Sequence, residues 1–259
     1  MNFRNLHWRP GFYYSIITVF IIVFSSCVNT RKATYFNDLE DSTRFPNTQL
    51  PRSLIQPNDI LSITVSSLNP EATVIFNTPV TVIANDQFPG YLVAADSTIL
   101  FPVLGNIKAG GLTKDQLKNS LTKSLVDKKL LVDPIVNVRF QNFRVTVLGE
   151  VKNPAVIPVP SEKISLLEAI GLAGDLTIYA KRDNVLVIRE ENDEKTVKRL
   201  NLNSNELFTS PYYYLKSNDV VYVAPNKNRV ASTARSQLWL PILFSALSFA
   251  AIIADRSLR

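Results

Sequence analysis

Pro57-Asn-Asp-Ile-Leu-Ser-Ile-Thr-Val65 is the stretch that decides how this chain folds. Asn58 tolerates a left-handed turn conformation, and the alternation of apolar and polar residues after it predicts a half-buried strand. Residues 216–224, Lys-Ser-Asn-Asp-Val-Val-Tyr-Val-Ala, repeat the same order of an Asn-Asp pair before a β-branched run. The repetition predicts two related modules.

Each of the two modules is also predicted to contain a helix that begins with an N-terminal capping motif. Thr113-Lys-Asp-Gln116 and Ser165-Leu-Leu-Glu168 are capping boxes, in which a hydroxyl accepts a backbone N–H and the Gln or Glu side chain reaches back. Leucines recur every fourth residue after the first box, and the second helix is expected to stop at Gly174.

Short strand patterns flank both predicted helices. Two precede each helix and are expected to form a hairpin, and one follows it, which predicts an α+β fold built from two small modules of a sheet and a helix. The patterns before the helices cover 91–93 with 98–101 and 144–151 with 155–159, and those after them cover 135–140 and 185–189.

Five phrases of the chain, taken in order, resemble the outer-membrane polysaccharide export proteins of the Wza type. The phrases are Pro57–Val65, Pro102–Thr113, Val147–Ala155, Leu167–Asp175 and Leu215–Pro225. The resemblance implies an export module over 54–142 and a β-grasp module for soluble ligands, the SLBB domain, over 143–226. Asn58, Ala155 and Asp175 stand where that family prefers glycine, so local differences are expected at those positions.

The N-terminal residues are typical of a bacterial lipoprotein signal. Arg4 and Arg9 precede an apolar run of about thirteen residues, too short to span a membrane comfortably, and small residues stand directly before Cys27. We therefore expect residues 1–26 to be a signal peptide and Cys27 to carry acyl chains, palmitate among them. Residues 27–53 are expected to be a tether. The alternative is an uncleaved helix with an incidental cysteine.

The C-terminal segment, 227–259, is predicted to be a linker followed by a transmembrane helix over 238–254. That run has no charged residue and would extend about 26 Å as a helix. Small residues at a spacing of four favour helix–helix packing in a membrane, and a tryptophan at the start suits the membrane interface. The packing residues are Ser245, Ala246, Ala250 and Ala254, and the interface residue is Trp239. The alternative is a single lipid-embedded anchor.

Composition excludes several kinds of site. The only histidine, His7, and the only cysteine both lie at or before residue 27, so a mature chain would lack the usual general base and zinc ligands. We expect no metal site, no cofactor and no enzymatic activity. The net charge of +6 falls to +4 without the two N-terminal arginines, which does not favour nucleic acid binding.

The predicted function is structural. The resemblance implies an outer-membrane lipoprotein, largely periplasmic, that oligomerises into a ring or channel exporting capsular polysaccharide or exopolysaccharide. It also implies an inner-membrane polysaccharide co-polymerase, often with tyrosine kinase activity, as a partner. The alternative is a membrane-tethered sugar-binding or scaffold module without a pore, with sugar contacts at Tyr212, Tyr213 and Tyr214 beside Phe208. A carboxylate glycosidase using Glu150 and Glu168 is a third, weaker hypothesis.

Overall fold

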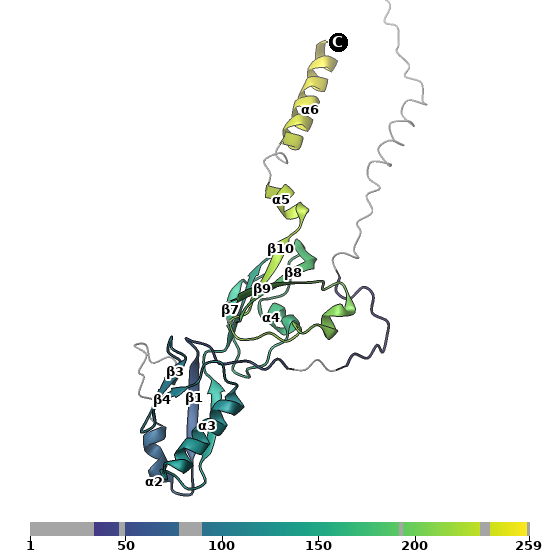
Figure 1. The fold of residues 1–259 in the computed structure, drawn as a ribbon. Helices are drawn as coiled ribbons and strands as arrows, with labels where there is room; N and C mark the ends of the chain where they lie inside the picture. The colour runs from purple at the N-terminus through teal and green to yellow at the C-terminus, as the bar shows by residue number, and fades with distance from the viewer. Residues whose placement is uncertain (1–33, 47–49, 78–89, 192–193, 234–238, 258–259) are drawn as a thin grey trace, which may run out of the picture.

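The computed structural model describes residues 34–46, 50–77, 90–191, 194–233 and 239–257. It is an α+β protein with two modules joined by a short linker and followed by two helices, as Figure 1 shows. The signal peptide predicted over 1–26 and the proposed lipidation site, Cys27, lie outside the described residues.

The first module is a three-stranded antiparallel sheet covered by a helix. The sheet has the order β2-β1-β5, and a separate hairpin pairs β3 with β4. The predicted hairpin was wrong in one respect, because β2 pairs with β1 rather than with β3. The elements are β1 (Ile60–Ser66), α2 (Pro70–Thr73), a 3-10 turn η2 (Val74–Phe76), β2 (Tyr91–Leu92), β3 (Thr98–Phe101), β4 (Gly105–Lys108), α3 (Lys114–Asp127) and β5 (Ile135–Phe140).

The second module is a five-stranded mixed sheet of order β7-β6-β10-β8-β9. Strand β10 runs parallel to β6 and antiparallel to β8, while β6 and β7 form the predicted hairpin. The elements are β6 (Arg144–Gly149), β7 (Ala155–Pro158), α4 (Leu166–Leu172), β8 (Ala180–Glu191), β9 (Glu194–Leu200), a 3-10 turn η3 (Asn205–Thr209) and β10 (Val220–Pro225).

Both capping boxes are confirmed. Thr113 Oγ accepts the N–H of Gln116 at 3.2 Å, and the Gln116 side chain accepts the N–H of Thr113 at 2.8 Å. Ser165 and Glu168 make the same reciprocal pair, at 3.2 and 2.7 Å. The apolar faces behind these caps are buried: Leu117, Leu121 and Leu125 on α3, and Leu166, Ala169 and Ile170 on α4.

The repeated Asn-Asp turns are also confirmed. Asn58 and Asn218 both adopt a left-handed conformation, with φ of 68° and 65°. Asp59 accepts the N–H of Gln56 at 2.8 Å, and Asp219 accepts the N–H of Lys216 at 2.8 Å. Asp175, another position where the related family prefers glycine, has a φ of 72°. The polar residues therefore take the turn conformations that glycine would supply.

The chain ends in α5 (Lys227–Thr233) and α6 (Trp239–Ser257), which rises away from the second module (Figure 1). A helix does form over the predicted C-terminal segment. However, no helix among the described residues is long and apolar enough to cross a membrane, so the predicted transmembrane helix over 238–254 is not supported. The uncharged run is seventeen residues, whereas a span requires about 20.

Part of the predicted tether is bound to the second module by backbone hydrogen bonds. The backbone N–H of Phe36 donates to Leu202 at 3.1 Å, and that of Asn37 donates to Asn203 at 2.9 Å. These bonds hold part of residues 34–46 against the second module. Aromatic residues in an otherwise polar stretch supply the apolar surface that makes this contact favourable.

Candidate functional site

The two Asn-Asp turns meet at the linker between the modules. The N–H of Ile60 donates to the side chain of Asn142 at 2.9 Å, and the Asn142 amide donates to the carbonyl of Asn58 at 3.1 Å. On the other side, the N–H of Asn218 donates to the carbonyl of Arg144 at 2.8 Å. The turns that begin β1 and β10 thus hold both ends of the linker.

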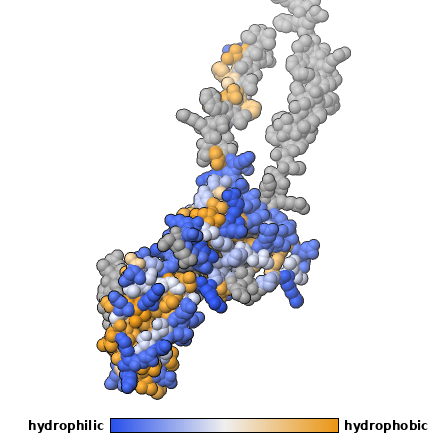
Figure 2. All heavy atoms as spheres, viewed as in Figure 1, coloured by the Kyte–Doolittle hydropathy of each residue, from blue (hydrophilic) through white to orange (hydrophobic). Residues whose placement is uncertain are grey.

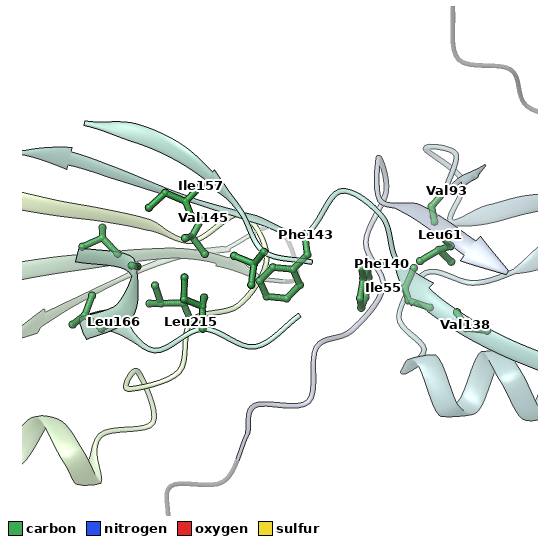
Figure 3. Packing of buried hydrophobic residues seen from close by; sticks show 14 of the residues in the cluster. Ile55, Leu61, Val93, Val138, Phe140, Phe143, Val145, Ile157, Leu166 and Leu215 are labelled. Carbon is green, nitrogen blue, oxygen red and sulfur yellow. The ribbon is translucent and has the colours of Figure 1, made fainter. Parts of the chain in front are cut away.

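The core of each module continues up to this linker. Figure 3 shows Ile55 and Phe140 on the side of the first module and Phe143 on the side of the second. The Phe140 and Phe143 rings lie edge to face, with centroids 6.4 Å apart. All three side chains are buried, so the junction has an apolar centre.

Glu162 links the two modules through its side chain, and we call its contacts to Lys114, Arg139 and Phe140 the clasp. It lies in the loop between β7 and α4, has a φ of 56°, and its side chain is only 8% exposed. One carboxylate oxygen accepts the N–H of Phe140 at 3.1 Å and lies 3.5 Å from Nε of Arg139, and the other pairs with Lys114. Three donors from the first module therefore converge on one carboxylate of the second.

Two neighbouring clefts open beside this clasp, and we call them together the junction cleft. The larger has a volume of about 640 Å³ and the smaller about 410 Å³, and both are lined by Lys114 and Asp115. Asp115 and Glu162 are the acidic residues among the described lining. Five cationic side chains line the junction cleft: Arg52, Lys114, Lys118, Arg139 and Lys163. No local sequence pattern indicates this site, because its residues come from distant segments of the chain.

The predicted sugar-contact residues lie elsewhere in the second module and are half-buried. The Tyr212 ring packs under the Arg189 guanidinium, 4.6 Å from its centroid. The ammonium of Lys163 lies 5.0 Å from the Tyr214 ring centroid. Tyr213 and Tyr214 meet edge to face at 5.0 Å. These rings have partners within the chain, and their role in sugar binding remains a prediction.

The N-terminal segment covers part of the same aromatic cluster. Phe36 and Phe45 pack against Phe208, with ring centroids 4.9 and 5.0 Å away. The hydroxyl of Tyr35 donates to Asp175, and burial together with this hydrogen bond raises the pKa of Tyr35 above its usual value. The segment that follows the proposed lipidation site is thereby attached to the second module.

A buried ion pair lies beside these tyrosines, because Arg189, which contacts the Tyr212 ring, also pairs with Asp219. Arg189 donates to both carboxylate oxygens of Asp219, at 2.9 and 2.7 Å, and the two side chains are 8% and 1% exposed. Burial by itself would lower the pKa of Arg189, but the hydrogen bonds and charge of Asp219 outweigh it, so the pKa is raised. This pair is part of the structure of the module rather than an exposed anion site.

Asp59, the counterpart of Asp219 in the first module, has no such cation. Among the described residues no salt bridge to Asp59 is found, and its side chain is buried at 3% exposure. Burial raises the pKa of Asp59 to about 6, while the backbone N–H of Gln56 opposes the shift. The two equivalent turns therefore differ in their electrostatics.

The carboxylates of the glycosidase hypothesis are occupied by other parts of the chain. Glu150 accepts the Thr177 hydroxyl at 2.7 Å and pairs with Arg229 at 3.2 Å. Glu168 completes the capping box at Ser165. In the part of the chain that the structure describes, no cluster of metal-ligating side chains is found either.

The expected packing residues of the C-terminal segment are described only in part. Ser245 and Ala246 are exposed on α6, and the Ser245 hydroxyl donates to the Pro241 carbonyl at 2.8 Å. The side chains of Trp239, Ala250 and Ala254 lie outside the described part. Large apolar side chains of α6 are more than half exposed: Ile242, Leu243, Phe244, Phe249, Ile252 and Ile253. Figure 2 shows hydrophobic residues, in orange, on the surface of this helix.

Comparison with known proteins links these two modules to polysaccharide export. Residues 47–141 match the sequence profile of the polysaccharide biosynthesis/export proteins, and residues 143–223 match that of the SLBB domain. The chain is similar to the EPS I polysaccharide export outer membrane protein EpsA of Ralstonia solanacearum, with 27% identity over 54% of this chain and 37% of that protein. It is 32% identical to the EpsA of Ralstonia nicotianae over 34% of this chain and 23% of that protein. The chain thus spans well under half the length of these relatives.

Proposed function

We propose that this chain, whose residues 47–141 match the polysaccharide biosynthesis/export proteins, forms part of an outer-membrane apparatus that exports capsular polysaccharide or exopolysaccharide. The observation that carries the proposal is the order of the two matched domains, which occupy consecutive residues 47–141 and 143–223. The curated relatives are named as outer-membrane export proteins. The family is one of export proteins rather than of enzymes, in keeping with the structural use of Glu150 and Glu168.

The proposed working form is a homo-oligomer that makes a ring or channel for the polymer. The exposed apolar surface of α6 supports self-association, because large apolar side chains are rarely left in water along a whole helix. Ser245 and Ala246 provide a small-residue position at which two α6 helices can approach closely. On this view α6 packs against α6 of neighbouring copies.

The proposed anchor is an acylated Cys27. A lipid at that position would hold the protein at the outer membrane, since acyl chains contribute about 0.8 kcal/mol per buried methylene. The docking of Phe36 and Asn37 on the second module places the body of the chain within nine or ten residues of this anchor. Membrane fractionation and mass analysis of a Cys27→Ser variant test the anchor, and unchanged processing of that variant would contradict it.

The proposed partners are the polysaccharide itself and an inner-membrane polysaccharide co-polymerase, with or without tyrosine kinase activity. Both are implied by the resemblance to Wza-type proteins. Affinity purification of the full chain from its native membrane, after cross-linking, tests the second partner.

The decisive experiment combines export with oligomer mass. A strain that lacks the gene is expected to lose polysaccharide from its surface and to regain it when the full chain is restored. The protein purified in mild detergent is expected to be a discrete oligomer by native mass measurement. Monomers alone, or normal export without the protein, would refute the proposal.

The alternative is a tethered sugar-binding or scaffold module without a pore, for which the aromatic cluster around Phe208 and Tyr213 is the supporting feature. Conductance across a planar bilayer separates the two. A channel gives discrete current steps after reconstitution, whereas a tethered module gives none while retaining sugar binding.

A further inference from the structure

We propose that the junction cleft binds the acidic sugar residues of an anionic polysaccharide, through Arg52, Lys118 and Lys163. This inference rests on the proposed export function and names the class of polymer that the chain would contact. It concerns a site between the two modules rather than the aromatic cluster of the second module.

The charged side chains of the junction cleft favour an anionic ligand. Glu162 is already matched by Lys114, Arg139 and a backbone N–H, so these groups compensate one another inside the clasp. Among the described residues, Arg52, Lys118 and Lys163 form no salt bridge and all three are exposed, while the Lys163 ammonium also lies 5.0 Å from the Tyr214 ring centroid. The side chains still available to a ligand are therefore mostly cationic.

The size of the junction cleft suits a short sugar chain. The larger part of the junction cleft, about 640 Å³, lies within the range of about 300–1,000 Å³ typical of small-ligand sites. The smaller part, about 410 Å³, is lined by residues of α3 and β5, among them Lys118 and Arg139. A cleft of this size and extent suits a short stretch of a sugar chain rather than a single small ion.

The chemistry of the walls of the junction cleft also suits an acidic sugar. Arg52 offers a planar guanidinium that can hold a carboxylate with two parallel hydrogen bonds. Lys163 lines the larger part of the junction cleft and Lys118 the smaller, and each offers a point charge on a flexible stem. Gln116 uses its oxygen in the capping box, so its amide N–H groups remain to donate to sugar hydroxyls. Phe140 and Phe143 provide an apolar floor.

The rigid clasp explains why these groups are held in place. Lys118 lies on α3 of the first module, whereas Lys163 adjoins Glu162 in the second. Because Glu162 binds Lys114 and the Phe140 N–H, it fixes the separation of the two cationic walls. A ligand that spans both walls would thus meet a site organised before binding.

The test is a titration of the full chain in detergent with a short oligogalacturonide, and with a neutral maltooligosaccharide of the same length. Only the acidic oligomer is expected to bind. Its affinity is expected to fall as salt is raised, because the Debye length shrinks from about 10 Å at 0.1 M to about 3 Å at 1 M.

The variant Arg52→Ala/Lys118→Ala/Lys163→Ala is expected to weaken binding of the acidic oligomer by about tenfold or more, because three contacts to charged groups are lost together. The matched control is Lys181→Ala/Lys198→Ala/Arg199→Ala, which removes the same charge from exposed positions on β8 and β9. The control is expected to retain binding. All six residues are exposed, so both variants are expected to fold.

Several outcomes would overturn the inference. An equal loss of affinity for the acidic oligomer in the two triple variants would mean that only net charge matters. Equal binding of the neutral oligomer would remove the selectivity for acidic sugars. A change in oligomer mass without a change in sugar affinity would make the junction cleft a contact between copies of the chain. Export restored by the wild-type chain and equally by the cleft variant would refute the cleft while leaving the proposed function intact. Failure of the wild-type chain to restore export would refute the function itself.

Discussion

Replacing Asp219 by alanine is expected to destabilise the second module severely. Asp219 and Arg189 are both buried and share three hydrogen bonds of 2.9, 3.3 and 2.7 Å. Removing one partner of such a pair costs about 3–5 kcal/mol, because the other charge stays buried without compensation. Asp219 also accepts the N–H of Lys216 at 2.8 Å, which adds about 1 kcal/mol.

The assay is hydrogen–deuterium exchange of the full chain in detergent, read peptide by peptide. A combined loss of about 4–6 kcal/mol lowers the protection of the β8 and β10 amides by about three to four orders of magnitude, at 1.4 kcal/mol per tenfold. Amides of β1 and β5 in the first module serve as an internal reference, because they belong to a separate sheet.

Two further variants separate the ion pair from general disruption. Glu190→Ala breaks a pair with Lys195 on the same sheet whose side chains are 61% and 69% exposed, and it is expected to cost less than about 1 kcal/mol. The double variant Arg189→Met/Asp219→Asn removes both charges and keeps an acceptor for Lys216, so it is expected to recover much of the lost protection. A cost of Asp219→Ala no larger than that of Glu190→Ala would refute the reasoning.

Three other predictions concern single positions. The raised pKa of Asp59, about 6, means that the contribution of Asp59 to stability is greatest below about pH 4 and is lost as pH rises through 6. Asp59→Asn is expected to remove that contribution to the pH dependence and to gain up to about 3 kcal/mol at pH 8, measured as the difference in denaturation midpoint between pH 4 and 8. A pH profile equal to that of the wild type would contradict this prediction. Gly149→Ala is expected to lower the free energy of unfolding by about 3 kcal/mol or more, because a Cβ there would lie 2.0 Å from the Val223 carbonyl oxygen. The φ of 93° at this position is also unfavourable for alanine. A thermal midpoint equal to that of the wild type would show that the strand shifts freely. Glu162→Ala is expected to speed exchange of the Phe140 amide hydrogen, whereas Glu162→Gln keeps an acceptor and preserves its protection; equal rates in the two variants would mean that the clasp does not hold this bond.

Local sequence features predicted local structure well. The capping boxes at Thr113 and Ser165 and the turns at Asn58 and Asn218 depend on contacts within a few residues, so the side chains that make them are visible in the sequence. The same holds for β5, which the pattern of alternating residues located over 135–140. The two-module α+β plan follows from these elements, and the resemblance to export proteins follows from their order.

Only the tertiary structure revealed the contacts between distant segments. Nothing near Glu162 in the sequence indicates that it binds Lys114, 48 residues away, or that Phe36 docks on Leu202. The junction cleft arises from several such contacts at once, which is why none of its cations was predicted as a site residue. The sequence by itself therefore determined the turns, the helix starts and the resemblance to export proteins. The fold alone decided how the modules join, since burial and charge pairing depend on which remote side chains meet.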